Sequence, residues 1–170
     1  MSRLIEGRAW KLGDDVNTDL IIPGKYKLSI TSLDELAKHA MEGVDPHFAE
    51  KFRREDLIVA GKNFGGGSSR EQAPLVLKHI GVGAIIARSF ARIFYRNSVN
   101  VGLPVVECKD VDKISDQDIL RVDLEAGVIK NLTKEGIYRV KSFPTELWQI
   151  LSEGGLVQYV KKHRRLPWQT

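Results

Sequence analysis

Three short apolar runs in the middle of the chain alternate with segments of helical periodicity. Residues 57–60 and 84–87 are as continuously apolar as a strand that is covered on both faces, and residues 104–107, apolar as far as Glu107, form the third run. Between them, apolar positions recur every three or four residues, first from near Ser68 and then after Ala87. This alternation of strand and helix predicts right-handed crossovers and a mostly parallel core sheet.

Weaker signals on both sides of this core predict further elements. Ser32 and Glu35 have the spacing of a capping box, so a helix is expected to start there. The other expected elements are strands at 5–12 and 18–22, an exposed loop at 25–30, a hairpin of strands at 119–123 and 128–132, and short closing helices at 147–151 and 156–160. No repeat or linker divides the chain, so residues 1–170 are expected to form one α/β domain with an added β portion and C-terminal helices.

The composition is that of an ordinary folded domain. The chain has 170 residues, of which 42% are hydrophobic and 28% charged, and 26 Lys+Arg against 22 Asp+Glu give a net charge of +4. This small excess lacks the dense basic face of a nucleic-acid binder, and no apolar run approaches the roughly 18 residues of a membrane span. The first residues carry no apolar signal region. We therefore expect a cytoplasmic protein that binds neither nucleic acid nor membrane.

A single cysteine, Cys108, limits the redox and metal chemistry of the chain. It excludes an internal disulfide, a CxxC pair and an all-cysteine metal site. An iron–sulfur cluster, which takes several thiolates, therefore cannot be held by this chain alone. The four histidines show no ligand spacing with one another, so no metal site is expected on the chain and Cys108 is expected in the core.

The glycine-rich segment from Gly65 to Arg70 carries the most chemistry. Three glycines let the backbone turn sharply, and two serines and an arginine follow at the expected start of a helix. A helix N-terminus and a guanidinium both favour an anion such as a carboxylate or phosphate. A tight turn with Ser68 or Ser69 as a simple N-cap explains the spacing equally well. Because the chain lacks both the order of a phosphate-binding loop and a GxGxxG fingerprint, small carboxylates rank above nucleotides as ligands.

A resemblance to a known family extends this interpretation. The segment Gly61-Lys62-Asn63-Phe64-Gly65-x-Gly67-Ser68-Ser69-Arg70-Glu71 resembles the signature of the small subunits of isopropylmalate isomerase, which form the swivelling domain of the aconitase superfamily. Further segments that match in order and spacing are Trp10-Lys11, Asn17-Thr18-Asp19, Ile22-Pro23, Ala87 to Asn97, Gly102-Leu103-Pro104 and Glu153 to Leu156. The resemblance covers nearly the whole chain and implies the swivelling β/β/α fold of that superfamily.

The resemblance also implies a reaction and a role for each matching residue. Enzymes of this family dehydrate and rehydrate a hydroxy dicarboxylic acid, which moves the hydroxyl to the neighbouring carbon. By resemblance, Ser68 is the base that removes the carbon-bound proton, Ser69 and Arg70 hold a substrate carboxylate, and Asp19 is an active-site aspartate. The partner in this family is a large subunit that carries a [4Fe-4S] cluster. No cofactor is therefore expected on this chain itself.

Elementary energetics indicate that such a serine cannot act in the isolated chain. Bulk water, a rough guide to an aliphatic hydroxyl, has a pKa of about 15.7, and lowering it by about 8 units requires roughly 11 kcal/mol. A helix N-terminus supplies at most about 2 kcal/mol, and one exposed arginine adds little more. The remainder has to come from further cations and from water exclusion at an assembled site. We expect activity only when the chain is docked on its partner.

Two further features bear on the site and its surroundings. The family usually has His at position 72, where this chain has Gln72, which keeps some hydrogen bonds but cannot carry a charge. Arg88, Arg92 and Arg96 are spaced at i, i+4 and i+8, which predicts a basic stripe on the helix after Ala87. Such a stripe is either a solvated face or a contact with the partner subunit.

Substrate preference is expected to depend on the loop formed by Tyr26, Lys27, Leu28 and Ser29. In homoaconitase-type relatives the third position is an arginine that grips an extra carboxylate. Leu28 cannot pair a charge, but it gains about 0.8 kcal/mol for each CH₂ that an isopropyl group buries against it. The resemblance, together with Leu28, implies 2-isopropylmalate as substrate, with homoaconitase or a related malate-type hydro-lyase as the alternative. A non-enzymatic anion-binding module is the alternative from a different class.

Overall fold

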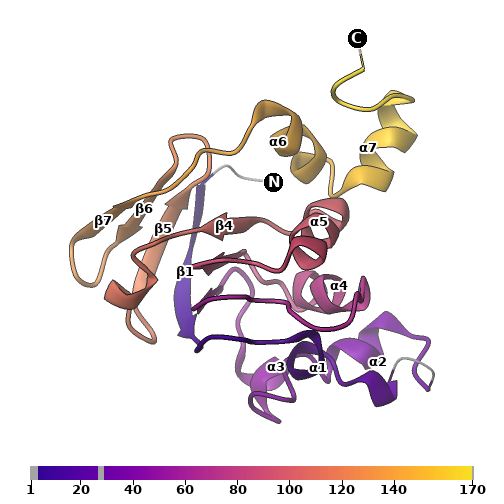
Figure 1. Ribbon diagram of the computed structural model, residues 1–170, viewed down its shortest axis with the longest axis horizontal. Coiled ribbons are helices and arrows are strands. Elements are labelled where there is room, and N and C mark those ends of the chain that lie inside the picture. The colour runs from indigo at the N-terminus through magenta and orange to yellow at the C-terminus, as the bar shows by residue number, and fades with distance from the viewer. Residues whose placement is uncertain (1–3, 27–28, 170) are drawn as a thin grey trace.

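Seven strands form a single curled sheet in the computed structural model, which describes residues 4–26 and 29–169. In spatial order the strands are β4 (Val105–Glu107), β3 (Ala84–Ala87), β2 (Leu57–Ala60), β1 (Leu4–Lys11), β5 (Ile119–Asp123), β6 (Val128–Asn131) and β7 (Gly136–Arg139). The first four run parallel, and the last three continue the sheet with antiparallel pairing (Figure 1). The α/β prediction, with a parallel core and an added β portion, is confirmed, although the sequence analysis missed β7.

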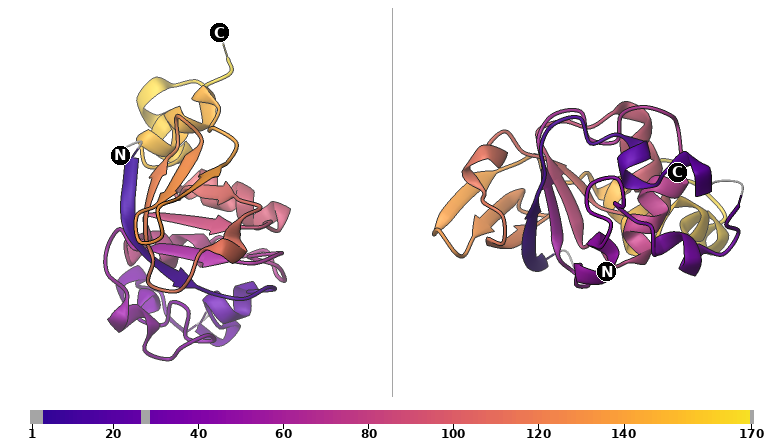
Figure 2. Two further views of the ribbon diagram at one scale, coloured as in Figure 1. Left: turned by 90° about the vertical axis from the view of Figure 1, so that its left-hand side faces the viewer. Right: turned by 90° about the horizontal axis from the view of Figure 1, so that it is seen from below.

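β1 belongs to both parts of the sheet and lets the antiparallel part fold over the parallel one. Its second half pairs in parallel with β2, with Ala9 opposite Leu57, whereas its first half pairs antiparallel with β5, with Ile5 opposite Val122. The parallel strands therefore lie between the antiparallel layer and the helices (Figure 2). Burial on both faces explains why the runs at 57–60 and 84–87 are apolar at every position.

The helices pack mainly on the other face of the parallel strands (Figure 1). In chain order they are α1 (Thr18–Ile21), α2 (Leu33–Ala37), α3 (Phe48–Lys51), α4 (Gln72–His79), α5 (Arg92–Val101), α6 (Thr145–Ser152) and α7 (Leu156–His163), with 3-10 turns at Gly24–Tyr26 and Val111–Lys113. α4 packs beside α5, and the two C-terminal helices contact α5 in turn. The expected cap at Ser32 is confirmed, because its side chain accepts a hydrogen bond from the Glu35 N–H.

Two expectations for the backbone near the glycine-rich segment are wrong. Residues 18–22 do not form a strand, because Asn17 caps a short helix there and accepts hydrogen bonds from the N–H groups of Asp19 and Leu20. The helix expected near Ser68 begins only at Gln72. Pro74 gives the reason, because a proline fits only the first turn of a helix and clashes with the carbonyl four residues before it.

The helix after Ala87 also starts later than expected. Because α5 begins at Arg92, Arg88 lies outside it and pairs instead with Asp112, so only Arg92 and Arg96 form the basic stripe. Ile93, the second residue of α5, has 51% of its surface exposed. In the described part of the chain, no helix is both long and apolar enough to cross a membrane.

Candidate active site

The glycine-rich segment follows β2 and lies against the first turns of α5. Gly65 and Gly67 have φ angles of +79° and +88°, which side-chain-bearing residues rarely adopt. A Cβ atom at Gly65 would also overlap the Phe94 ring. Glycine at these positions is thus what lets the loop reach α5 and present Ser68 and Ser69 at the surface.

The N-terminus of α1 is joined to this loop by two backbone hydrogen bonds and one side-chain hydrogen bond. The Thr18 N–H donates to the Gly66 carbonyl at 2.9 Å, and the Thr18 hydroxyl donates to the Ser68 carbonyl at 3.0 Å. The Gly65 N–H donates in turn to the Val16 carbonyl at 2.7 Å. Thr18, only 2% exposed, is a positioning residue that the sequence analysis missed. These bonds bring the two expected site segments together.

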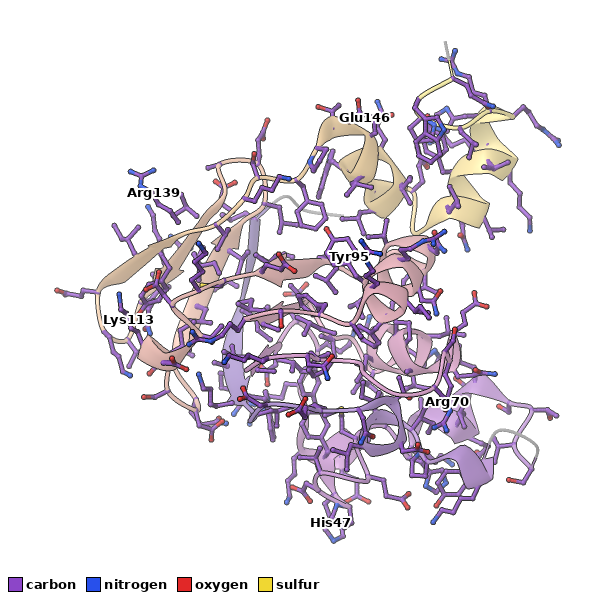
Figure 3. All side chains as sticks on the ribbon, in the orientation of Figure 1. His47, Arg70, Tyr95, Lys113, Arg139 and Glu146 are labelled. Atoms are coloured by element: carbon purple, nitrogen blue, oxygen red, sulfur yellow. The ribbon has the colours of Figure 1, made fainter. Side chains whose placement is uncertain are left out.

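Arg70 and Asp19, both predicted site residues, form an ion pair. Nη1 of Arg70, the residue labelled in Figure 3, lies 2.7 Å from Asp19 Oδ1. The same Nη1 also donates to the Ile22 carbonyl at 3.0 Å. The Arg70 side chain is 13% exposed and that of Asp19 is 59% exposed. The hydrogen bond from Arg70 holds the pKa of Asp19 below its usual value, with a smaller contribution from the Gly24 N–H. The cation is therefore fixed, while the carboxylate faces solvent.

Both predicted serines line an open cavity of about 180 Å³ together with Arg70. Neither hydroxyl has a hydrogen-bond partner among the described residues. The sequence analysis gave no site role to three other residues of the lining, Thr18, Arg92 and Asn97. Arg92 and Asn97 stand in the matching segment Ala87 to Asn97, and that position was the available signal. Gln72 opens α4 and does not line the cavity.

The predicted specificity loop is described only at its two ends. The Tyr26 hydroxyl donates to Glu42 at 2.9 Å, and the Tyr26 ring stacks on His39 at 3.9 Å. Burial raises the pKa of Glu42, but hydrogen bonds from His39, Tyr26 and Lys25 outweigh it and hold the pKa below the usual value. The Ser29 hydroxyl donates to the Lys25 carbonyl at 3.1 Å. Lys27 and Leu28 lie outside the described residues.

The chain's own residues do not fit an iron–sulfur cluster. Cys108 is buried in the core, as expected, and burial raises the pKa of its thiol, which disfavours a thiolate ligand. Within residues 4–26 and 29–169, no three His, Cys, Asp or Glu side chains are grouped so that they could hold a metal ion. The chemistry that this site offers is therefore the binding of an anion by Arg70 beside two free hydroxyls.

Comparison with known proteins places this geometry in a family. The profile of the aconitase C-terminal domain matches residues 17–110, which include both halves of the site. The chain is 60% identical over 157 residues to a 3-isopropylmalate dehydratase small subunit of Archaeoglobus fulgidus. The aligned residues make up 92% of this chain and 94% of that protein. The chain belongs to the 3-isopropylmalate dehydratase small-subunit family.

Two further relatives agree with this assignment and widen it. The crystal structure of 3-isopropylmalate dehydratase from Methanocaldococcus jannaschii superposes with a TM-score of 0.89 at 48% identity, over 95% of each chain. The homoaconitase small subunit of Methanothermobacter thermautotrophicus is 56% identical over 163 residues, which are 95% of this chain and 94% of that protein. The family therefore contains relatives named for two different substrates at similar identity to this chain.

Proposed function

We propose that the chain, acting as a single cytoplasmic domain, is the small subunit of a hydro-lyase that isomerises 2-isopropylmalate to 3-isopropylmalate. The observation that carries the proposal is the arrangement around Arg70. Its guanidinium is nearly buried, its Nε and Nη2 have no partner among the described residues, and two free serine hydroxyls lie in the same cavity. That arrangement suits a small carboxylate substrate.

Arg70 acts as the anchor for the substrate carboxylate. Because Nη1 is held by Asp19 and the Ile22 carbonyl, the plane of the guanidinium is fixed and its remaining N–H groups can meet a carboxylate in bidentate fashion. Ser69 donates a further hydrogen bond to the same carboxylate. The ionised oxygen of Ser68, one residue earlier, then accepts the proton from the carbon next to the one that loses the hydroxyl. The Ser68 hydroxyl formed in this way later returns the proton to the carbon that lost the hydroxyl, while water adds to its neighbour.

The open site explains why a partner is needed. Ser68 and Ser69 are exposed, and water at an exposed hydroxyl weakens the electrostatic stabilisation of its ionised form. A large subunit that covers the cavity excludes this water and adds further cations. Its [4Fe-4S] cluster supplies the Lewis acid for the departing hydroxyl group. The dehydration then takes place between the two subunits.

Leu28 sets the preference between the two candidate substrates. An apolar side chain in the loop that starts at Tyr26 favours an isopropyl group and disfavours the extra carboxylate of homoaconitate. Tyr26 and its partner Glu42 fix the start of this loop. The homoaconitase small subunit among the relatives keeps homoaconitate as the second candidate.

Reconstitution with the large subunit tests the proposal. The chain is co-expressed with the large subunit encoded in its own genome, and both substrates are assayed without oxygen. We expect no turnover by the isolated chain, turnover by the complex, and a higher kcat/KM for isopropylmalate. A complex with an intact cluster that is inactive on both substrates would contradict the proposal, whereas the absence of any complex would favour an anion-binding module.

A loop variant tests the substrate argument separately. Leu28→Arg should shift the kcat/KM ratio toward homoaconitate by about 10- to 100-fold, the usual range for a hydrogen bond to a charged group. Leu132→Arg, at a surface leucine that is 40% exposed and outside the site, is the matched control and should leave the ratio unchanged. An unchanged ratio in both variants would show that the loop does not determine the substrate.

A further inference from the structure

A second, larger hollow lies on the other side of Arg92 and Ile93 from the serine cavity. It has a volume of about 620 Å³ and runs between α5, the edge strand β4 and the connection from β7 to α6. Tyr95 lies between α5 and α6 beside β4 (Figure 3). We call this hollow the α5–β4 groove. Because Arg92 and Ile93 line both hollows, the groove lies directly beside the candidate active site.

The groove combines an apolar floor with a basic rim. Phe90, Val105 and Phe143 contribute apolar surface, and Ile93 exposes 51% of its surface beside them. An exposed large apolar side chain next to a concave apolar surface is typical of a protein contact site. Since β4 is the outer strand of the sheet, no neighbouring strand of the described chain covers this side.

The rim carries three cations whose side chains have no partner among the residues that the structure describes. Arg92, Arg96 and Lys141 are exposed, and none of their side chains forms an ion pair or hydrogen bond with a described residue. Glu107 is the single acidic residue that lines the groove among the described residues. By contrast, Arg70 and Arg88, which flank the same end of the sheet, each have an aspartate partner. The rim therefore offers positive charge to a partner.

We propose that the α5–β4 groove is the docking site for the large subunit, which would present an apolar segment flanked by acidic side chains. This inference rests on the proposed function. A partner that closes the serine cavity has to cover Arg92 and Ile93, and these two residues are also the near wall of the groove. The cavity and the groove thus form one continuous contact surface.

Charge argues against a second copy of this chain as the occupant. A symmetric dimer through the groove would place Arg92, Arg96 and Lys141 opposite the same cations of the other copy. Like charges across an interface cost free energy and suppress that pairing. An acidic partner meets the rim without this penalty.

Binding measurements with the purified large subunit, made without substrate, test the groove. Ile93→Asp and Arg96→Glu should each weaken the dissociation constant at least tenfold, and the loss for Arg96→Glu should shrink as salt concentration rises. Ile137→Asp on β7 and Lys130→Glu on β6, at exposed positions that do not line the groove, are the matched controls and should stay within twofold of wild type. Circular dichroism checks that each variant is folded, and Arg96→Glu on the solvent-exposed face of α5 keeps the test valid should Ile93→Asp fail to fold.

The outcomes separate this inference from the proposed function. No complex with wild-type chain would overturn the proposed function. If the wild-type chain binds the large subunit and both groove variants bind it with unchanged affinity, the groove is not the docking site, while the proposed function stands. Self-association of the chain that Ile93→Asp abolishes, with binding of the large subunit unchanged, would assign the groove to a second copy and likewise overturn the proposal.

Discussion

The two ends of β2 each carry an aspartate–arginine pair, and the two pairs are arranged in opposite ways. Before the strand, Asp56 has a side chain that is only 6% exposed and accepts hydrogen bonds from Arg8 Nη2 at 2.8 Å and Trp10 Nε1 at 2.9 Å. After the strand, the arginine of the Arg70–Asp19 pair is the shielded partner and the carboxylate is exposed. The Asp56 carboxylate is enclosed by the fold, whereas the Asp19 carboxylate is open to solvent and can give way to another anion.

The pair around Asp56 stabilises the fold, whereas the pair around Arg70 is suited to binding a ligand. The Asp56 carboxylate is surrounded by donors from β1 and from the turn before β2, so no room or donor is left for a ligand. Arg70 keeps N–H groups that no described residue uses, and Asp19 can yield part of its contact to an incoming carboxylate. A buried charge must be satisfied by the fold, whereas a binding site needs a fixed charge with spare capacity.

The largest expected effect is on catalysis at the carboxyl end of the strand. Ser68→Ala removes the proposed base, and general-base catalysis contributes about 10²- to 10⁴-fold, so kcat of the reconstituted enzyme should fall by about 10³-fold. The free energy of unfolding should not change, because the Ser68 hydroxyl has no partner among the described residues. Steady-state kinetics and chemical denaturation measure the two quantities. A kcat within tenfold of wild type would assign the proton transfer to another group.

The next largest effect is on stability at the amino end. Asp56→Ala leaves Arg8 and the Trp10 N–H without their acceptor, and such a loss of one partner from a buried pair costs about 3 kcal/mol. Asp19→Ala removes an exposed carboxylate and should cost less than about 1 kcal/mol, while it lowers kcat/KM of the reconstituted enzyme. Urea denaturation of both variants decides this point. Equal losses of stability would remove the distinction between the two pairs.

Lowering the pH should also distinguish the two aspartates, through smaller changes in the free energy of unfolding. Burial raises the pKa of Asp56, but hydrogen bonds from Trp10 and Arg8 outweigh it, so the folded-state pKa lies below the unfolded one. The pair thus contributes its stability above pH of about 3.9 and loses it as pH falls through the folded-state pKa. The stability difference between wild type and Asp56→Asn should be constant near neutrality and narrow below about pH 4.

The exposed pair serves as the control for this titration. The hydrogen bond from Arg70 also lowers the pKa of Asp19, but solvent screens the pair. The stability difference between wild type and Asp19→Asn should therefore be small at every pH. Denaturation curves recorded between about pH 3 and pH 7 test both expectations. A wider gap for Asp56→Asn at low pH than at neutrality would reverse the sign and contradict the assignment.

Much of the architecture could be predicted from the sequence because its signals are local. The strands at 57–60 and 84–87 are buried on both faces, so every residue in each of them is apolar. The glycine-rich turn could be recognised because Gly65 and Gly67 adopt conformations that other residues avoid. A signal of this kind needs no knowledge of the rest of the fold.

The features that the sequence analysis missed depend on short elements or distant contacts. Helix α1 has four residues, too few for apolar periodicity to distinguish it from a strand, although Asn17 was an available cap signal. Thr18 belongs to the site only because it bonds to Ser68, 50 positions away. The α5–β4 groove joins β4 to residues after β7, and no local pattern indicates that contact.

The smallest expected effect comes from Gly24→Ala beside the Arg70–Asp19 pair. A Cβ atom at Gly24 would lie 3.1 Å from Arg70 Nη2 and 3.4 Å from Asp19 Oδ1, so Gly24→Ala should displace the guanidinium by a few tenths of an ångström. Since this weakens carboxylate binding equally in ground and transition states, KM should rise a few-fold with kcat unchanged. Stability should stay within about 0.5 kcal/mol.

Gly7→Ala makes the same change beside the enclosed pair, and the expected result is the opposite one. A Cβ atom at Gly7 would overlap the Glu55 carbonyl and lie 2.9 Å from Asp56 Cα, and backbone cannot move aside as a side-chain tip can. The folded fraction should therefore fall, while the KM of the folded enzyme should not change. If Gly7→Ala altered KM, or Gly24→Ala reduced stability as much as Gly7→Ala does, the two ends of β2 would share one role. The two ends of β2 have different roles because the Asp56 carboxylate contacts only side chains and backbone of the fold, whereas Arg70 faces an open cavity.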